Sequence, residues 1–243
     1  MGLQTVLRDS VKFVFGIFGF DIVRQKNSPE STMLGLRQAP FHTIIDVGAN
    51  SGQFAKRISG VFPQASLYCF EPLPDPFDEL TLWADTKNGR VTTYNLAIGD
   101  TAGEVDMYLH DNHTPSSSIL ATTALSLDNY PIVEEQTRIR VKQMTLDGAL
   151  QEASDELTPE VLVKLDVQGY EDRVISGGSE VLARASACIV EVCLDSLYEG
   201  QARFSKLVSM LESLGFAYAG NLQQTYGEDG HCAFLDAVFI RRA

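Results

Sequence analysis

The sequence contains little cysteine and little positive charge, and it lacks hydrophobic runs long enough to cross a membrane. Its 243 residues include four cysteines, and no two of them form a Cys-x-x-Cys pair. The 19 Lys and Arg against 32 Asp and Glu give a formal net charge of −13. Because such a field repels phosphate backbones, it argues against a nucleic-acid partner. The uncharged run Phe13–Phe20 has eight residues, whereas a membrane span needs about 20.

The cysteines themselves favour a reducing environment. Cys69, Cys188 and Cys193 lie in apolar stretches, and Cys232 is the fourth. We expect reduced cysteines that act as small core residues, rather than a zinc site or disulfides. This composition indicates a cytoplasmic protein.

An amphipathic helix is predicted near the N-terminus. Apolar residues fall near helical spacing at Leu3, Leu7, Val14 and Phe18, with Arg8 and Lys12 beside them. We expect this helix to pack on its own domain or on a partner, and contact with a membrane surface is the alternative. Residues 24–40 are polar and form a connector. The chain therefore divides into an N-terminal helix with connector, 1–40, and a main domain, 41–243, with an insertion or lid region at 100–145.

Strand and helix patterns alternate through the main domain. Strands are expected at 41–47, 66–70, 91–98, 161–167 and 187–193, and helices at 51–60, 75–86, 170–183 and 202–214. Short strands at 216–219 and 234–241 close the chain. This alternation predicts a Rossmann-like α/β fold, with a mostly parallel central sheet, helices on both faces and an antiparallel C-terminal strand.

The middle of the chain is less regular. Residues 104–109 and 138–144 alternate in the manner of strands and are expected to pair antiparallel. The long segment between them, roughly 111–136, is a candidate lid. His110 and His113 form a His-x-x-His pair there, but no third ligand is near in sequence, so we do not expect zinc.

The first strand runs into a turn typical of a ligand site, Asp46–Gly52. Gly48 and Gly52 permit a sharp bend, and the amides of such a turn can hold an anionic group. The dinucleotide pattern Gly-x-Gly-x-x-Gly is not met, since Asn50 and Gln53 occupy its second and third glycine positions. A single amino-acid carboxylate therefore suits this turn better than a pyrophosphate.

Two further strand ends carry suitable residues. Glu71 ends the second strand, 25 residues after Asp46, where a carboxylate can accept both hydroxyls of a ribose. The segment Asn95–Gly99 provides small residues against which a flat base can lie. In an open α/β sheet, ligands bind outside the carboxyl ends of the strands.

Together these segments resemble the S-adenosylmethionine site of class I methyltransferases. The segment Lys164–Glu171 resembles the Lys-x-Asp-x-Glu-Gly-x-Glu signature of the FkbM family. Four more segments occur along the chain in the same order as in that family: Ser116–Ile119, Thr145–Asp147, Ile189–Glu191 and Asp236–Arg241. The resemblance covers about 41–241. Gln168 stands where the family usually has Glu, so we do not assign it the role of base.

The resemblance implies methyl transfer from S-adenosylmethionine to a hydroxyl of a natural product or sugar. Asp166 would face the methionine amino group or the acceptor, and Glu71 would hold the ribose. Ala97 and one or more of Ser116–Ser118, with Ser117 at their centre, would line the adenine. The methionine part would be surrounded by Asp46, Gly48, Ala49, Asn50 and Gly52.

An alcohol is a poor nucleophile, so a base or a metal should assist the reaction. Asp166, Glu191 and Glu171 are the candidates, although Glu171 could instead cap the following helix. These carboxylates could also hold Mg²⁺, although no spacing demands it. The alternatives are a non-catalytic S-adenosylmethionine-binding module that acts through a partner and, less favoured, an NAD-dependent oxidoreductase. The chain could also form a homo-oligomer.

Overall fold

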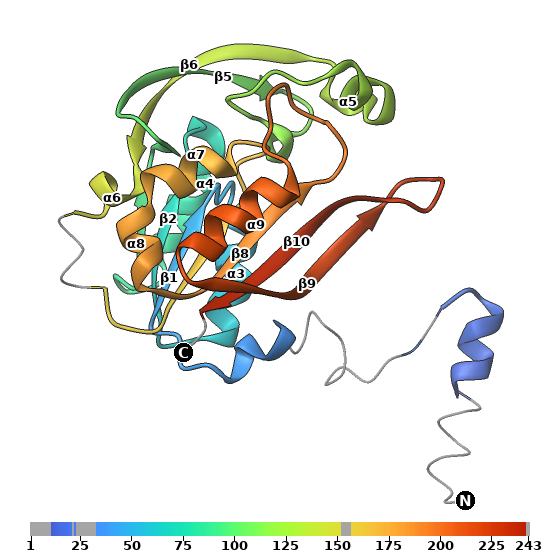
Figure 1. Ribbon diagram of the computed structural model, residues 1–243, viewed down its shortest axis with the longest axis horizontal. Coiled ribbons are helices and arrows are strands. Elements are labelled where there is room, and N and C mark those ends of the chain that lie inside the picture. The colour runs from blue at the N-terminus through green and yellow to red at the C-terminus, as the bar shows by residue number, and fades with distance from the viewer. Residues whose placement is uncertain (1–10, 21, 23–32, 152–156, 242–243) are drawn as a thin grey trace, which may run out of the picture.

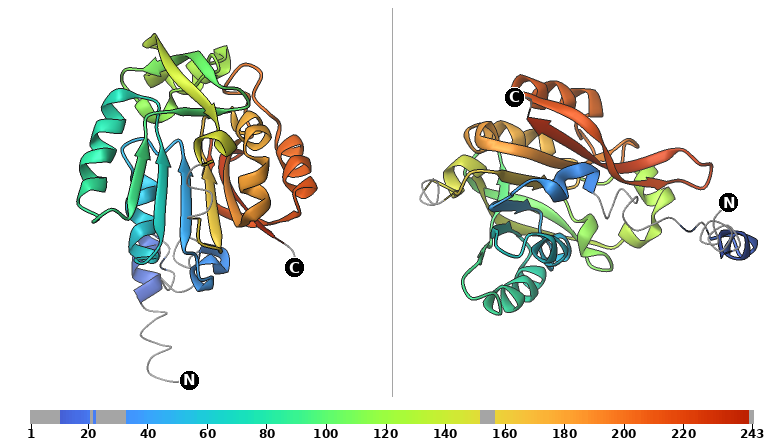
Figure 2. Two further views of the ribbon diagram at one scale, coloured as in Figure 1. Left: turned by 90° about the vertical axis from the view of Figure 1, so that its left-hand side faces the viewer. Right: turned by 90° about the horizontal axis from the view of Figure 1, so that it is seen from below.

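A twisted seven-stranded sheet runs through the part of the chain that the structure describes (Figures 1 and 2). The computed structural model describes residues 11–20, 22, 33–151 and 157–241. The strand order is β3-β2-β1-β7-β8-β10-β9, and all neighbours are parallel except that β10 is antiparallel to both β8 and β9. The strands are β1 (Thr43–Val47), β2 (Ser66–Phe70), β3 (Val91–Tyr94), β7 (Val161–Leu165), β8 (Ala185–Cys193), β9 (Phe216–Tyr226) and β10 (Cys232–Arg241).

Helices cover both faces of this sheet, which explains the continuous apolar runs of its central strands. Every residue of β1 and β7 is buried, as expected for parallel strands packed on both sides. One face packs against α7 (Glu171–Gly177), α8 (Ser179–Arg184) and α9 (Phe204–Ser213). The other packs against η2 (Met33–Gln38), α3 (Gln53–Val61) and α4 (Pro74–Asp85). The predicted fold class is confirmed.

A second, three-stranded sheet lies over the carboxyl edge of the first (Figure 2, left). It contains β4 (Ala97–Gly99), β5 (Gly103–His110) and β6 (Gln136–Thr145), followed by the short helix α6 (Leu146–Ala149). The antiparallel pairing of β5 with β6 confirms the prediction for this region. The predicted lid segment between them contains η3 (Thr114–Ser116), α5 (Ala124–Asn129) and η4 (Pro131–Val133).

Three elements differ from their predicted form. The strand expected at 91–98 is split between two sheets, because the Asn95 side chain binds the backbone oxygens of Glu71 and Pro72 and turns the chain. The helix expected at 170–183 breaks after Gly177, where a Cβ would lie 2.0 Å from the Gly99 oxygen. Strand β9 is longer than expected, since it pairs with β10 along a long hairpin.

The N-terminal segment of the described chain is a short helix with exposed apolar side chains. Residues 11–17 are helical, and Phe13 and Phe18 are each 72% exposed. The predicted positions Leu3, Leu7 and Arg8 lie outside the described residues. Further along, Met33 and Leu36 of η2 are buried and join the core beside α3. None of the described helices is both long and apolar enough to cross a membrane.

Candidate active site

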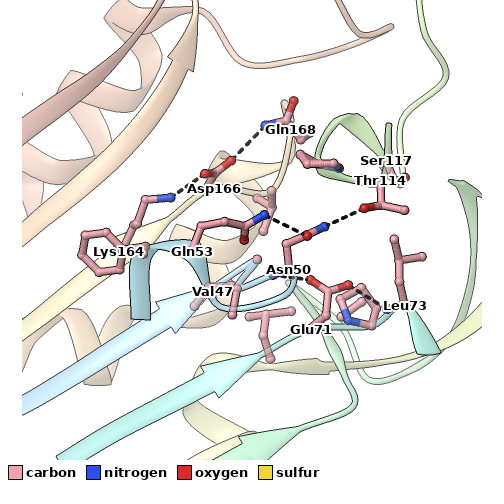
Figure 3. A pocket seen from close by; sticks show the side chains of 18 of the residues that line it. Val47, Asn50, Gln53, Glu71, Leu73, Thr114, Ser117, Lys164, Asp166 and Gln168 are labelled. Atoms are coloured by element: carbon pink, nitrogen blue, oxygen red, sulfur yellow. Dashed lines mark hydrogen bonds and ion pairs between the residues drawn. The ribbon is translucent and has the colours of Figure 1, made fainter. Parts of the chain in front are cut away.

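A cavity of about 360 Å³ lies at the carboxyl ends of β1, β2 and β7 (Figure 3). The β1–α3 turn forms one wall, and the ends of β2 and β7 form the next two. The lid segment contributes the fourth wall through Thr114, Pro115, Ser117 and Ile119. The cavity therefore lies at the edge of the sheet where the sequence analysis expected the strand-end residues to meet.

The β1–α3 turn depends on residues with left-handed backbone conformation. Gly48 has a φ of +82°, and a Cβ at this position would lie 1.8 Å from the backbone carbonyl oxygen of Asp166. Glycine is thus required because the turn packs against the end of β7. Asn50 has a φ of +46°, which asparagine tolerates better than most residues. Its Nδ2 donates to Thr114 Oγ1 at 3.3 Å, so the turn also contacts the lid.

Glu71 lies in the cavity wall with only 4% of its surface exposed. Its Oε2 accepts from the Asn50 N–H at 2.7 Å, and its Oε1 accepts from the Leu73 N–H at 2.8 Å. Burial raises the pKa of Glu71 to about 7, against the opposing effect of these two hydrogen bonds. Each oxygen retains a second lone pair. Glu71 can therefore accept further hydrogen bonds from two ligand hydroxyls.

Asp46 lies under the turn rather than in the cavity wall. Its side chain is fully buried, and neither oxygen has a hydrogen-bond partner among the described residues. Burial raises the pKa of Asp46 to about 6, although the Lys164 charge acts to lower it. A buried polar group without a partner is uncommon and often marks a ligand site.

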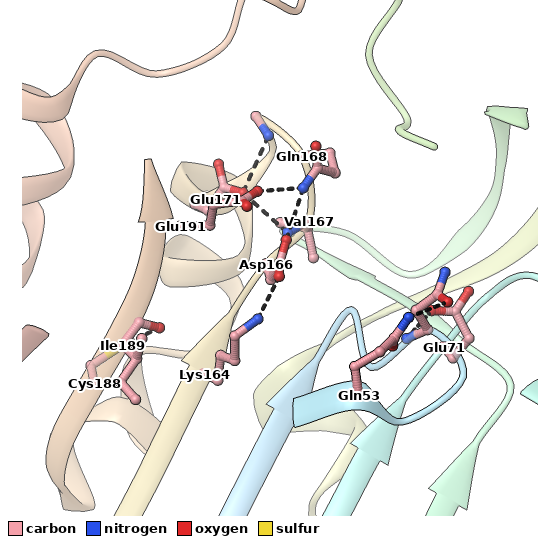
Figure 4. A network of polar contacts seen from close by, with 12 residues as sticks. Gln53, Glu71, Lys164, Asp166, Val167, Gln168, Glu171, Cys188, Ile189 and Glu191 are labelled. Carbon is pink, nitrogen blue, oxygen red and sulfur yellow. Dashed lines mark hydrogen bonds and ion pairs between the residues drawn. The ribbon is translucent and has the colours of Figure 1, made fainter. Parts of the chain in front are cut away.

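A polar network crosses the ends of β7 and β8 (Figure 4). Lys164 Nζ pairs with Asp166 Oδ2 and lies 5.3 Å from the centre of the Phe54 ring. The Lys164 side chain is 8% exposed and that of Asp166 is 25% exposed, so the carboxylate is the accessible partner. Burial acts to lower the pKa of Lys164, but the charges of Asp166 and Asp46 outweigh it and keep the ammonium protonated.

The carboxyl groups of Asp166 and Glu191 differ in how strongly they bind a proton. Burial acts to raise the pKa of Asp166, but Lys164 and hydrogen bonds hold it below its ordinary value. Burial and the neighbouring Asp166 raise the pKa of Glu191 well above its ordinary value. Glu191 therefore binds a proton more tightly than Asp166 does. Gln168 Nε2 donates to Asp166 Oδ1 at 2.9 Å and also contacts Glu191 Oε2.

The structure brings most of the predicted residues to one cavity. Those in its wall are Gly48, Ala49, Asn50, Glu71, Ala97, Ser117 and Asp166. Glu191 reaches the site through Asp166 and Gln168. Gly52 instead turns the chain beside Leu80, with a φ of +88°. Glu171 is buried, and its Oε1 accepts from the Val167 and Gly169 N–H groups. That carboxyl stabilises the β7–α7 loop, and burial raises its pKa to about 7.

Sequence reasoning did not assign several residues of the cavity wall. These are Gln53, Phe54, Arg57, Lys164, Gln168 and Asp236. Gln53 and Arg57 are four residues apart on α3, and this spacing places them on one helix face. Asp236 pairs in register with Glu191 across β8 and β10. The sequence around Asp236 indicated a strand and a segment in the order of the FkbM family, but no role for Asp236 itself, since the pairing that brings it to the site appears only in the fold.

The two histidines of the lid region do not form a metal site. His110 is fully buried, and His113 is exposed, with its Nδ1 2.8 Å from Ser116 Oγ. Across residues 11–20, 22, 33–151 and 157–241, no group of three or more His, Cys, Asp or Glu is arranged to hold a metal. All four cysteines are free thiols.

Comparison with known families connects this geometry to a reaction. The methyltransferase FkbM domain matches residues 46–218 of this chain. The chain belongs to this family. The matched range begins at Asp46 in β1 and includes Glu71, the Lys164–Glu171 segment and Glu191. The enzyme is therefore a methyltransferase that uses S-adenosylmethionine, and the oxidoreductase alternative is set aside.

Individual relatives share less than a third of their aligned residues with this chain. The 2-O-methyltransferase NoeI of Sinorhizobium fredii is 29% identical over 196 residues, which are 74% of this chain and 75% of NoeI. The hexuronic acid methyltransferase AglP of Haloferax volcanii is 27% identical over 147 residues, 60% of this chain and 54% of AglP. A crystal structure of an FkbM methyltransferase from Methylobacillus flagellatus aligns with a TM-score of 0.49 at 11% identity. That alignment covers 83% of this chain and 44% of the other.

The residues around the cavity fit S-adenosylmethionine. Glu71 in the cavity wall suits a ribose, whereas the carboxyl of Asp46 is buried under the β1–α3 turn and does not line the cavity. The part of the cavity wall that contains Ala97 and Ser117 is otherwise apolar, since Leu73, Ile98 and Met107 also line the cavity. A purine base requires an apolar surface of this kind. The cavity lies at the strand ends where the sequence analysis expected the donor to bind.

Proposed function

We propose that this FkbM methyltransferase transfers a methyl group to a hydroxyl of a sugar or a similar small polyhydroxylated molecule. The observation that carries the proposal is the position of Asp166, an ionised carboxylate in the cavity wall between the expected nucleoside end and a second, polar end. The names of NoeI and AglP, a 2-O-methyltransferase and a hexuronic acid methyltransferase, support this class of acceptor.

The donor occupies the end of the cavity nearest the β1–α3 turn. Glu71 holds the ribose hydroxyls, and Ala97 with Ser117 lines the adenine. Gly48, Ala49 and Asn50 in the cavity wall surround the methionine part, while Asp46 and Gly52 support this turn without lining the cavity. S-adenosylmethionine supplies a methyl group on a sulfonium, which makes that carbon electrophilic.

Asp166 acts as the base that takes the acceptor's hydroxyl proton. Lys164 keeps this carboxylate ionised and fixes its position, and positioned proton transfer contributes about 10²–10⁴-fold to a rate. Glu191 is protonated and acts through its hydrogen bond to Asp166. Because Lys164 already supplies a positive charge at Asp166, the reaction does not need Mg²⁺ there. Glu171 is engaged with the β7–α7 loop and ranks last among the three candidates.

The acceptor binds beside the donor, on the side of the cavity lined by α3 and β10. Gln53 and Arg57 of α3 are exposed, and Asp236 of β10 is partly buried. Gln53 Nε2 donates to Asn50 Oδ1 of the turn at 3.1 Å. Burial raises the pKa of Asp236, and Lys164 and Arg57 act to lower it. Amide, guanidinium and carboxyl groups together provide both donors and acceptors for hydroxyl groups. This polar lining suits a polyhydroxylated acceptor better than an aromatic one.

Transfer of labelled methyl from S-adenosylmethionine to a panel of hexoses, methyl hexosides and hexuronic acids tests this proposal. We expect product with at least one member, and the product's methyl group should lie on oxygen by mass spectrometry and NMR. Donor binding without transfer to any hydroxylated acceptor would favour the non-catalytic alternative. Addition of EDTA should leave the rate unchanged, whereas a loss that Mg²⁺ restores would contradict the proposed carboxylate base.

We also propose that residues 11–20 contact a membrane surface and that the enzyme acts in the cytoplasm. Phe13, Ile17 and Phe18 are each more than half exposed, and apolar side chains of this kind partition into a bilayer interface. The net charge of −13 opposes anionic lipids. The full chain should therefore sediment with phosphatidylcholine vesicles, and the double variant F13S/F18S should not. Self-association that F13S/F18S abolishes, with no vesicle binding, would instead assign the segment to a homo-oligomer.

A further inference from the structure

Gln168 occupies an unusual position at the end of β7. Its backbone has a φ of +55°, a conformation that is uncommon for residues other than glycine. In this conformation its side chain turns back over the active site, where Nε2 donates to Asp166 and contacts Glu191 (Figure 4). Both amide hydrogens of Gln168 are thus committed to carboxyl oxygens.

The other side of this amide is held by Tyr198. Tyr198 lies between β8 and α9 and is 4% exposed. Its hydroxyl donates to Gln168 Oε1 at 2.7 Å and also lies 2.9 Å from the Ser116 oxygen. Burial raises the pKa of Tyr198 above its ordinary value. Burial therefore favours the protonated hydroxyl, whose one proton can be donated to Gln168 Oε1 or to the Ser116 backbone oxygen.

The orientation of the Gln168 amide matters because its oxygen and its nitrogen have different hydrogen-bonding chemistry. Its oxygen can only accept and its nitrogen can only donate. If the Gln168 amide turned over, its oxygen would face the ionised Asp166, and two acceptors would oppose each other. The carboxyl oxygens favour the orientation in which nitrogen faces them. In that orientation the amide oxygen faces the Tyr198 hydroxyl, which can donate to it at 2.7 Å and hold it in place.

We propose that Tyr198 is a positioning residue for methyl transfer, which holds the Gln168 amide so that its N–H groups stabilise the ionised form of Asp166. The inference deepens the proposed function, since it rests on Asp166 as the base of that reaction. It also explains how this chain works with glutamine where the family usually has glutamate. A neutral amide can hydrogen-bond both Asp166 and Glu191 without adding a second negative charge beside Asp166.

The lid belongs to the same arrangement. Ser118 Oγ donates to the Gln168 backbone oxygen at 2.7 Å, and the Ser116 oxygen lies beside the Tyr198 hydroxyl. Ser117, between them, lines the cavity. Tyr198 therefore joins the lid to the loop that carries Asp166, so one hydroxyl contacts both parts of the site.

Other charged groups also face the carboxyl pair, and the test must leave them in place. Removal of the Tyr198 oxygen deletes one atom and keeps the ring in its apolar cluster with Cys193 and Leu197. The titratable groups around the pair are Asp46 of β1, Glu71 after β2, Lys164 of β7, Glu171 of α7, Cys193 of β8 and Asp236 of β10.

The direct test is a carboxyl ¹³C NMR titration of the protein without donor or acceptor. Asp166→Asn and Glu191→Gln assign the two resonances. In Tyr198→Phe, we expect the proton affinity of Asp166 to rise about tenfold, because a hydrogen bond to the charged form is lost. Tyr130→Phe is the matched control, since Tyr130 packs against the same cluster but does not contact Gln168 within the described residues. Identical titration of Asp166 in wild type and Tyr198→Phe would overturn the proposal.

A second variant protects the test against misfolding. Gln168→Met keeps the length of the side chain and removes both donors, so it should raise the proton affinity of Asp166 at least as much as Tyr198→Phe. Once an acceptor is known, the acidic limb of the kcat/KM–pH profile, which reports the free enzyme, should move to higher pH by the same amount in Tyr198→Phe. A shift in the NMR titration without any methyl transfer by the wild type would support the positioning role while contradicting the proposed function.

Discussion

Individual carboxyl groups in this enzyme differ because their surroundings differ. Glu71 and Asp46 are buried, and burial outweighs the groups that act to lower their pKa values, so these are raised to about 7 and about 6. Asp166 is also removed from water, but Lys164 keeps its pKa below the ordinary value. The same side-chain chemistry thus provides a group suited to bind a donor, Glu71, and one that is ionised and able to accept a proton.

Glu71 should be important for donor affinity. Glu71→Gln keeps the size of the side chain and removes the charge that accepts the ribose hydrogen bonds. We expect the affinity for S-adenosylhomocysteine to fall by about 1–3 kcal/mol, measured by calorimetry. Glu79→Gln, an exposed position on α4, is the control and should bind as the wild type does. Equal affinity in both variants would remove Glu71 from the site.

Asp166 should be required for turnover but not for folding. Asp166→Asn should lower kcat about 10²–10⁴-fold, while S-adenosylhomocysteine still binds and the melting temperature stays within a few degrees. Asp78→Asn, an exposed position on α4, controls for the loss of one negative charge. If Asp166→Asn retains full activity, another group is the base.

Residues at strand ends were the ones that sequence could predict. Glu71 and Asp166 end parallel strands, and the carboxyl ends of parallel strands meet at one edge. Asp236 could not be found this way, because it lies inside an antiparallel strand. Glu171 was expected to be a candidate base, but its carboxyl accepts two N–H groups of its own loop. Such local satisfaction of a carboxylate is invisible in residue spacing.

At the scale of elements, the active site depends on the contact between the β1–α3 turn and the end of β7. Gly48 allows this contact, since a side chain there would overlap the Asp166 backbone. Most strands and helices were predicted because their apolar patterns are long and regular. The break between β3 and β4 was not, since it depends on hydrogen bonds from Asn95 to residues 24 and 23 positions earlier.

Gly48→Ala should destabilise the protein and misplace Asp166. The left-handed backbone alone costs alanine about 1–3 kcal/mol, and the overlap with Asp166 adds to this. Urea unfolding should therefore show a loss above about 2 kcal/mol. Gly60→Ala is the matched control, because it lies in α3 with open space around its Cβ position and should be neutral or stabilising by about 0.5–1 kcal/mol. Equal stability of the two variants would show that the turn can relax.

At the scale of the whole molecule, a net charge of −13 is combined with several buried carboxyl groups. Asp46, Glu71 and Glu171 have pKa values raised to about 6, 7 and 7. Between their ordinary values and pH 7, the folded protein keeps protons that the unfolded chain releases. Stability must therefore fall as pH rises through this window.

The protein without donor should be more stable at pH 5 than at pH 7.5. His110 acts in the opposite direction, since burial lowers its pKa, but it is one group against three. Each kcal/mol corresponds to about 2–4 °C in Tm for a chain of this size. The double variant Glu71→Gln, Glu171→Gln should reduce the difference between the two pH values. A wild-type stability that rises from pH 5 to pH 7.5 would contradict the raised pKa values.

The most direct measurement of the central claim is a crystal structure of the enzyme with S-adenosylhomocysteine. The account predicts that the ribose hydroxyls bind the Glu71 carboxylate, the base lies between Ala97 and Ser117, and the sulfur faces the part of the cavity lined by Asp166. A nucleoside bound elsewhere, or a ribose that makes no contact with Glu71, would contradict it.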